Sequence, residues 1–111
     1  MWFKVQVYLD IINHFGYRNQ MKKLNEEVFE FLEAVDNYED ELAFHFIGDK
    51  VGENFLRDSM VEEMGDILVL LTEFIAKYKI EKEELDVYMD YKLDRTLRRI
   101  ESGYYDKKEE E

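Results

Sequence analysis

Hydrophobic residues recur every three or four positions along most of this chain, the spacing that places them on one face of an α-helix. The pattern predicts a first helix over residues 2–15, which Gly16 ends, and a second helix over residues 19–38. No segment alternates between hydrophobic and polar residues as a half-exposed strand does. The sequence therefore predicts an all-α fold.

The second half of the chain predicts two more helices. Ser59 followed by Glu62 has the form of a capping box, so a third helix is expected to begin there, with a start near Glu53 as the alternative. It extends to about Tyr78. The fourth helix opens with acidic residues, which suit a helix N-terminus, and it ends at Gly103. Four such helices predict an antiparallel helical bundle.

The stretch between the second and third helices, residues 39–58, is less regular. Gly48, Asp49 and Gly52 interrupt its helical period. Its phenylalanines either pack a short helix or line a pocket, and packing is the favoured interpretation. Another glycine, Gly65, falls in the middle of the third helix, where close helix packing is the expected reason for it.

Length and composition predict one domain. The chain has 111 residues, of which 46% are hydrophobic and 15% aromatic, enough for one core. That domain is expected to span residues 1–105, with a mobile charged tail over residues 106–111. The absence of proline agrees with long helices. The absence of cysteine excludes disulfides and thiolate zinc sites.

The formal net charge of −12 limits the partners of the chain. It argues against nucleic acid and against anionic membranes, which both require a basic surface. No stretch approaches the roughly 18 apolar residues of a membrane span, and the N-terminus lacks the features of a signal peptide. We therefore expect a cytoplasmic protein whose charge leaves room for a cation.

Four carboxylates fall where water should be scarce. At about 100° per residue, Glu63 lies inside the apolar stripe of the third helix, and Asp66 lies one turn on at its edge. Glu27 and Glu30 occupy adjacent turns of the second helix, beside its own stripe. If these helices pack by their stripes, the four acids converge and need protons, bases or cations. Oxygen ligands without histidine or cysteine suit Mg²⁺ or Mn²⁺.

Basic residues occupy the fourth helix. Lys92 and Arg99 project into its apolar stripe, and Arg95 lies at the edge. They either pair with the acids or hold phosphate oxygens, and the spacing leaves both interpretations open. The two histidines, His14 and His45, are expected to be ordinary surface or core residues rather than metal ligands.

These acidic and basic segments resemble the motifs of the MazG-like nucleoside triphosphate pyrophosphohydrolases. The family has an EExxE motif followed, on another helix, by ExxD. The matching residues here are Glu26, Glu27, Glu30, Glu63 and Asp66. Residues 92–99 resemble the basic segment that follows, so the likeness covers about residues 20–103. Both acidic motifs in order, with the basic segment after them, make the resemblance specific.

The resemblance implies the all-α NTP pyrophosphatase fold and a Mg²⁺-dependent reaction, with Mn²⁺ as a substitute. A nucleoside triphosphate is split between its α- and β-phosphates, which gives a monophosphate and pyrophosphate. Carried over by motif, the metal ligands are Glu27, Glu30, Glu63 and Asp66. Glu26 and Glu27 take the catalytic positions, with Glu26 as a ligand or as the acid that positions water. The implied phosphate-binding residues are Lys23, Lys92, Arg95 and Arg99.

The resemblance also implies a homodimer or homotetramer. The aromatic residues Trp2, Phe3 and Tyr8, with the region from Phe44 to Phe55, are candidates for the interface. One departure concerns the gap between the acidic motifs, the 32 residues from Phe31 to Glu62, which is longer than usual in the family. The excess puts the choice of substrate in doubt more than the chemistry.

Two other functions are compatible with the sequence. The first is a phosphoribosyl-ATP pyrophosphatase or a dUTPase-like enzyme, which would share the fold and the acid clusters. The second is a helical interaction module without enzymatic activity, whose acids and bases only form salt bridges. A panel of substrates would distinguish the related enzymes from a MazG-like pyrophosphohydrolase. Stabilisation by added metal would distinguish a metal-dependent enzyme from an interaction module.

Overall fold

The computed structural model describes residues 4–44 and 50–109, and their regular structure is entirely helical. The five helices are α1 (Val5–Phe15), α2 (Tyr17–Phe44), α3 (Lys50–Lys77), α4 (Lys82–Glu101) and α5 (Tyr104–Glu109). Four of these are long and no strand occurs among the described residues, so the predicted all-α class is confirmed. The chain divides into two compact units that join at Tyr78 and Lys79.

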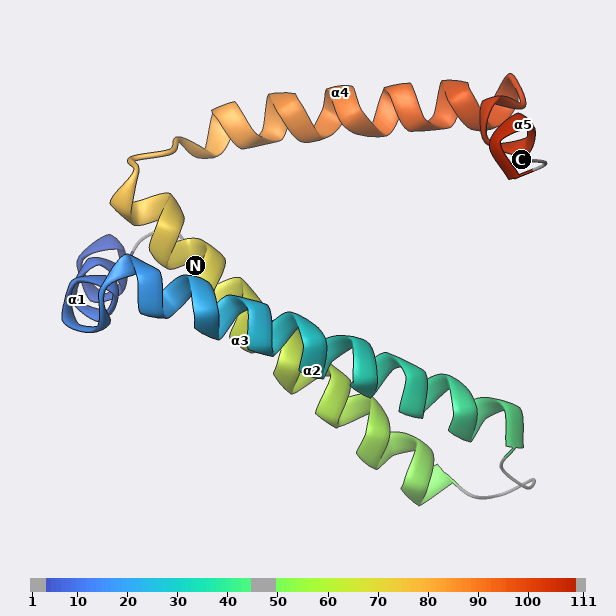
Figure 1. Cartoon of the computed structure of the whole chain (residues 1–111), viewed down its shortest axis with the longest axis horizontal. Coiled ribbons are helices and arrows are strands. Elements are labelled where there is room, and N and C mark those ends of the chain that lie inside the picture. Colours follow the sequence, from blue (N-terminus) through green and yellow to red (C-terminus); the bar gives the residue numbers. More distant parts are fainter. Residues whose placement is uncertain (1–3, 45–49, 110–111) are drawn as a thin grey trace. The chain divides into compact units, whose positions relative to one another are not determined.

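The first unit is built on the pair α2 and α3, which lie side by side, with α1 packed against one end (Figure 1). Gly16 separates α1 from α2, as predicted. Its φ of 87° lies where a side chain is strained, so glycine lets the chain turn directly from one helix into the next. The side chain of Asn19 donates a hydrogen bond of 2.7 Å to the carbonyl of Phe15 and closes the end of α1.

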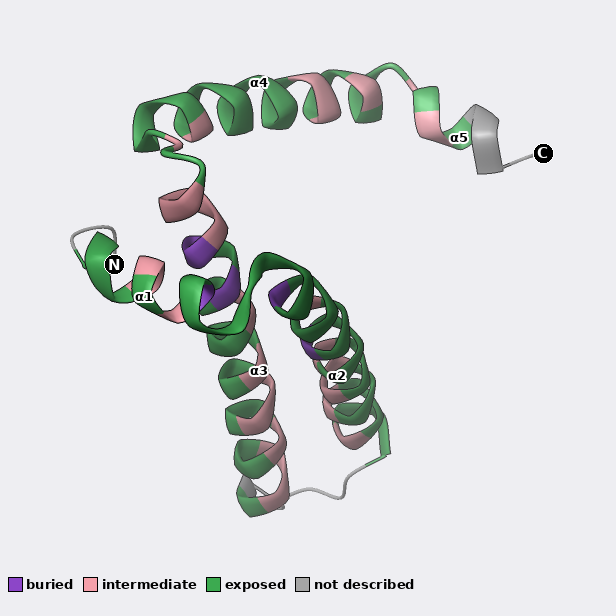
Figure 2. Cartoon of the chain, turned by 60° about the vertical axis from the view of Figure 1, so that its left-hand side comes forward, coloured by how far each residue is buried: buried purple, intermediate pink, exposed green. Residues whose placement is uncertain are grey.

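The buried residues of this unit gather towards one end of the helix pair, near α1 (Figure 2). Among the described residues, the buried hydrophobic side chains are Ile12 and Leu70. The buried polar residues outnumber them, and they are Gln20, Glu27, Thr72 and Glu73. Polar groups are costly to bury without partners, so this end of the unit is where a functional site is expected.

The helices that flank the connection between α2 and α3 are longer than predicted. α2 continues six residues beyond Tyr38 to Phe44, and α3 begins at Lys50. The predicted start at Ser59 is wrong, and the alternative start near Glu53 lies three residues from the observed one. The Ser59 hydroxyl donates to the carbonyl of Phe55, one turn earlier in the same helix, at 3.2 Å, so Ser59 does not cap the helix. At the end of α2, Glu41, Leu42 and Ala43 favour helix, which agrees with its extension to Phe44.

Most of the stretch that the sequence analysis treated as less regular is therefore helical, since residues 39–44 belong to α2 and residues 50–58 to α3. Phe44 and Phe55 do not pack within the chain, since they are 78% and 69% exposed. The expectations for His45, Phe46, Gly48 and Asp49 fall outside the described residues, as do those for Trp2 and Phe3.

Gly65 also differs from expectation. A Cβ atom at this position would meet no atom within 4 Å. Close packing between described helices of the same chain is therefore not the reason for this glycine.

The second unit consists of α4 and α5. The backbone N–H of Glu81 donates to the carboxylate of Glu84 at 3.1 Å, which caps the start of α4 where the acids were predicted to lie. Gly103, with φ of 75°, separates α4 from α5. Helix α5 carries regular structure into the predicted tail as far as Glu109, and the domain division at residue 105 stays a prediction. None of the described helices is long and apolar enough to cross a membrane.

Candidate metal centre

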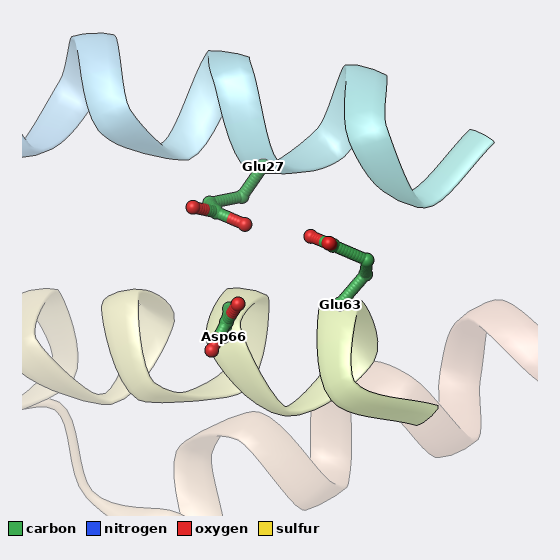
Figure 3. A group of neighbouring side chains, drawn as sticks. All are labelled: Glu27, Glu63 and Asp66. Carbon is green, nitrogen blue, oxygen red and sulfur yellow. The ribbon is translucent and has the colours of Figure 1, made fainter. Parts of the chain in front are cut away.

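Three carboxylates meet between α2 and α3. Glu27 of α2 and Glu63 of α3 point toward one another, and Asp66 lies beside them, one turn further along α3 (Figure 3). One oxygen from each residue lies within 4.8 Å of the others. The structure thus brings together three of the four predicted metal ligands, and they come from two helices that face each other.

Helix geometry places these side chains. Glu63 and Asp66 are three residues apart, so both face α2 from successive turns of α3. Glu27 is buried, Glu63 is half-buried and Asp66 is exposed. The cluster therefore runs from the helix interface outward, with one side open to a ligand that arrives from solvent.

Two oxygen atoms of the cluster have no hydrogen-bond partner among the described residues. Oε2 of Glu27 and Oε2 of Glu63 are both buried and neither makes a hydrogen bond. A buried carboxylate oxygen without a donor carries a full desolvation cost. A cation between the helices would contact both atoms and remove that cost.

The protonation of the two glutamates reflects this crowding. Contact with the Glu27 carboxyl, burial and the negative charge of Glu30 raise the pKa of Glu63 to about 7. A hydrogen bond from Lys23 lowers the pKa of Glu27, against the effect of burial. Without metal, Glu27 thus stays ionised while Glu63 holds a proton up to about neutral pH.

Lys23 is the cation at the edge of the cluster. Its Nζ lies 3.0 Å from Oε1 of Glu27, one turn away on the same helix. The lysine side chain is 53% exposed while that of Glu27 is 6% exposed. This ion pair satisfies one oxygen of Glu27 and leaves the other directed at Glu63 and Asp66.

The donor set fits Mg²⁺ or Mn²⁺. Its members are carboxylate oxygens, which hard cations prefer, and no described histidine takes part. Mg²⁺ holds its ligands at about 2.1 Å, so opposite ligand oxygens lie about 4.2 Å apart. The three carboxylate oxygens lie within 4.8 Å of one another, which is compatible with a shared ion of this size.

The other predicted acids lie around the cluster. Glu30 is exposed and outside the group of three, yet near enough for its charge to raise the pKa of Glu63. Glu26 is exposed and lines the pocket beside the cluster. The structure thus surrounds the three converging acids with the remaining two of the EExxE pattern.

The basic residues of α4 lie in the second unit. Lys92 is exposed, whereas Arg95 and Arg99 are half-buried. The guanidinium of Arg95 lies 5.4 Å from the centre of the Tyr91 ring, and its buried Nε has no hydrogen-bond partner. Arg99 stacks similarly on Tyr104 at 4.6 Å. Their predicted phosphate-binding roles stay predictions.

A pocket of about 650 Å³ opens beside the cluster in the first unit. Its wall includes Glu27 and Asp66 at one end and Gln20 and Glu73 further along the helices. The amide nitrogen of Gln20 donates a buried hydrogen bond of 2.7 Å to Oε1 of Glu73. The sequence analysis did not single out Glu73. The sequence did contain a signal for Glu73: it lies seven residues after Asp66, and residues seven apart lie on the same face of a helix.

The family comparison agrees with this geometry. The model of the MazG nucleotide pyrophosphohydrolase domain matches residues 15–102. The chain belongs to the MazG family. No curated protein and no solved structure shows significant similarity to it. The match spans both acidic motifs and the basic segment of α4, so the predicted resemblance is confirmed and this MazG domain is placed among the nucleotide pyrophosphohydrolases.

The raised pKa of Glu63 predicts a pH dependence of stability in the metal-free MazG domain. Between its ordinary value of 4.5 and about 7, the unfolded chain releases the Glu63 proton while the folded chain keeps it. The free energy of unfolding therefore falls as pH rises through this window. Urea denaturation with a chelator present should show this decline, and Glu63→Gln should reduce it. If the free energy of unfolding changed with pH in the same way in the wild type and in Glu63→Gln, Glu63 would not be the group that titrates in this window.

The unpartnered oxygens predict stabilisation by metal. Millimolar Mg²⁺ or Mn²⁺ should raise the melting temperature of the wild type. At a metal concentration of one hundred times the Kd, the free energy of unfolding should rise by about 2.7 kcal/mol. Glu63→Ala should abolish the gain and should stabilise the metal-free protein, because it removes a crowded carboxylate.

The matched control for the metal prediction is Glu62→Ala, which alters an exposed neighbour outside the cluster. This variant should keep the full metal response in differential scanning calorimetry. Equal responses of Glu62→Ala and Glu63→Ala would show that the metal acts elsewhere.

Proposed function

We propose that this MazG domain hydrolyses nucleoside triphosphates to nucleoside monophosphate and pyrophosphate, with Mg²⁺ as cofactor and Mn²⁺ as a substitute. The observation that supports the proposal is the convergence of Glu27, Glu63 and Asp66 beside a pocket of about 650 Å³. A pocket of this size accommodates a nucleotide-sized ligand. A cytoplasmic location belongs to the same proposal.

Each acid has a role in this reaction. Glu27, Glu63 and Asp66 hold the metal, and Glu30 completes the ligand set from the next turn of α2. A Mg²⁺ ion held by these acids would offset the negative charge of the triphosphate and polarise the attacked phosphorus. Glu26, at the exposed side of the pocket, orients the attacking water and accepts its proton.

The basic residues balance the charge of the substrate. Lys23 lines the pocket and is already directed at the cluster, so it binds a phosphate oxygen when the metal takes over Glu27. Lys92, Arg95 and Arg99 are proposed to bind the remaining phosphates. The Nε of Arg95, which has no hydrogen-bond partner among the described residues, supports this role, because an N–H group that lacks an acceptor suits a phosphate oxygen.

Product analysis is the direct test of the reaction. Wild-type protein with Mg²⁺ and a panel of nucleoside triphosphates should release pyrophosphate and not orthophosphate. Glu63→Ala should lose at least a hundredfold in rate, because losing a ligand removes the metal, while Glu62→Ala should stay near wild type. The panel should include dUTP and phosphoribosyl-ATP, since a strong preference for either would identify the corresponding related enzyme.

Two results would contradict the proposed reaction. Orthophosphate as the only product would mean cleavage at another bond. No release from any compound, together with no metal-induced stabilisation, would favour an interaction module without enzymatic activity.

We also propose that the domain works as a homodimer or homotetramer. Helix α3 carries a second row of hydrophobic residues that are 41–47% exposed in the single chain. They recur at helical spacing, and they are Val61, Met64, Leu68 and Leu71. When a helix carries apolar residues on more than one side, each of these sides is normally covered by another element or another subunit. Gly65 lies in the same row and would allow the close approach of a second copy.

Sedimentation equilibrium tests the oligomer. At micromolar concentration the wild type should sediment with at least twice the monomer mass of 13.6 kDa. Leu68→Glu should shift the equilibrium toward monomer, because it places a charge in the apolar row. The control is Leu93→Glu, at a position 61% exposed on α4. A monomeric wild type would refute the proposal.

A further inference from the structure

The buried pair of Gln20 and Glu73 is not used by the proposed hydrolysis. Glu73 is 2% exposed and Gln20 is 7% exposed, which makes them two of the most deeply buried side chains among the described residues. Burial raises the pKa of Glu73, and the hydrogen bond from Gln20 only partly offsets the effect. A carboxyl group held so deeply by one neutral amide retains the capacity to accept further hydrogen bonds.

The position of this pair relative to the metal centre suggests what it faces. Gln20 precedes Glu27 by seven residues on α2, and Glu73 follows Asp66 by seven residues on α3. Since α2 and α3 run antiparallel, Gln20 and Glu73 are displaced from the metal centre in the same direction along the pocket. Seven residues of helix span about 10 Å at 1.5 Å per residue. This length matches the reach from the phosphate chain of a nucleotide to the far edge of its base.

The wall between the two ends suits a nucleoside. Val69 and Leu70 supply apolar surface there, and Phe15 adds an aromatic ring from the end of α1. Phe15 is 53% exposed, and its ring makes an edge-to-face contact with His14 at 4.7 Å between ring centres, which leaves part of the ring accessible from the pocket. Stacking of a base on an aromatic side chain contributes about 1–3 kcal/mol and does not depend on which base is present. Discrimination between bases must therefore come from polar groups of the pocket wall, and the buried ones farthest along the helices from the metal centre are Gln20 and Glu73.

Resting on the proposed function, we propose that Glu73, oriented by Gln20, is the residue that selects the nucleobase, and that it selects guanine. A carboxylate offers two neighbouring acceptors. The edge of guanine offers two neighbouring donors, its ring N1–H and its 2-amino group, which form a bidentate pair with such a carboxylate. Uracil and thymine instead place a carbonyl on either side of a single N–H, and those carbonyls would face the carboxylate oxygens.

Adenine and cytosine should pair with Glu73 less well than guanine and better than uracil. Each has one amino donor next to a ring nitrogen acceptor, so each makes one hydrogen bond to Glu73 rather than two. A matched bidentate pair is worth about 1–3 kcal/mol of discrimination, which corresponds to about fivefold to 150-fold in kcat/KM. The expected order is therefore guanine first, adenine and cytosine next, and uracil last.

The test compares kcat/KM for GTP, ATP, CTP and UTP, measured by pyrophosphate release with Mg²⁺. Wild type should prefer GTP over UTP by at least tenfold. Glu73→Gln keeps the size of the side chain and its bond to Gln20 but replaces one acceptor with a donor, so this preference should disappear. Glu62→Gln, the same chemical change on an exposed turn of α3, should leave it intact. Gln20→Met removes the donor that orients Glu73 and should weaken the preference.

Two further measurements separate base selection from a structural role. The melting temperature and its rise with Mg²⁺ should be retained in Glu73→Gln, because the metal ligands are unchanged. Calorimetric titration with GMP and UMP, in the presence of Mg²⁺, measures base selection without hydrolysis. Wild type should bind GMP more tightly than UMP, and Glu73→Gln should bind the two alike.

The outcomes distinguish this inference from the proposed function. Pyrophosphate release with no preference for GTP, or with the same preference in Glu73→Gln, would overturn the inference and leave the reaction standing. No release from any nucleotide, with GMP binding that depends on Glu73, would overturn the reaction and support the inference. No release and no GMP binding would overturn both.

Discussion

Repulsion between carboxylates at the interface of α2 and α3 is the constraint on which the rest of the structure depends. Glu27 and Glu63 approach from opposite helices, and each keeps a buried oxygen that finds no hydrogen-bond donor in the part of the chain that the structure describes. Hydrophobic residues at the same positions would pack the helices better and would cost less. The chain instead keeps this crowded arrangement, stabilised in part by Lys23 and by a proton on Glu63. Such an arrangement is best explained by a cation that binds there.

The same constraint explains the polar character of the buried end of the first unit. Glu73 and Gln20 repeat the pattern of the metal centre seven residues away, again with one group from each helix. Between these two polar sites the pocket wall is apolar. A ligand with charge at one end, a flat ring whose face packs on apolar side chains and a hydrogen-bonding edge at the other end fits this sequence of surfaces, and a nucleotide has all three.

The sequence predicted the acids of the site better than the ends of the helices. The convergence of four acids was predicted from angular spacing together with the packing of two apolar stripes, and Glu27, Glu63 and Asp66 do converge, whereas Glu30 lies outside their group. The start of α3 was misplaced at Ser59, since a capping pattern is local and the surrounding residues also favour helix. Glu73 was missed because its importance depends on the register of α2 against α3, which brings Gln20 opposite to it.

The proposed reaction requires that Glu27, Glu63 and Asp66 together bind a divalent cation. Anomalous diffraction from crystals grown with Mn²⁺ tests this claim most directly, because it locates the ion without reference to activity. The account predicts a peak between α2 and α3, within coordination distance of all three carboxylates, that disappears in Glu63→Ala. A peak elsewhere, or none at millimolar Mn²⁺, would contradict it.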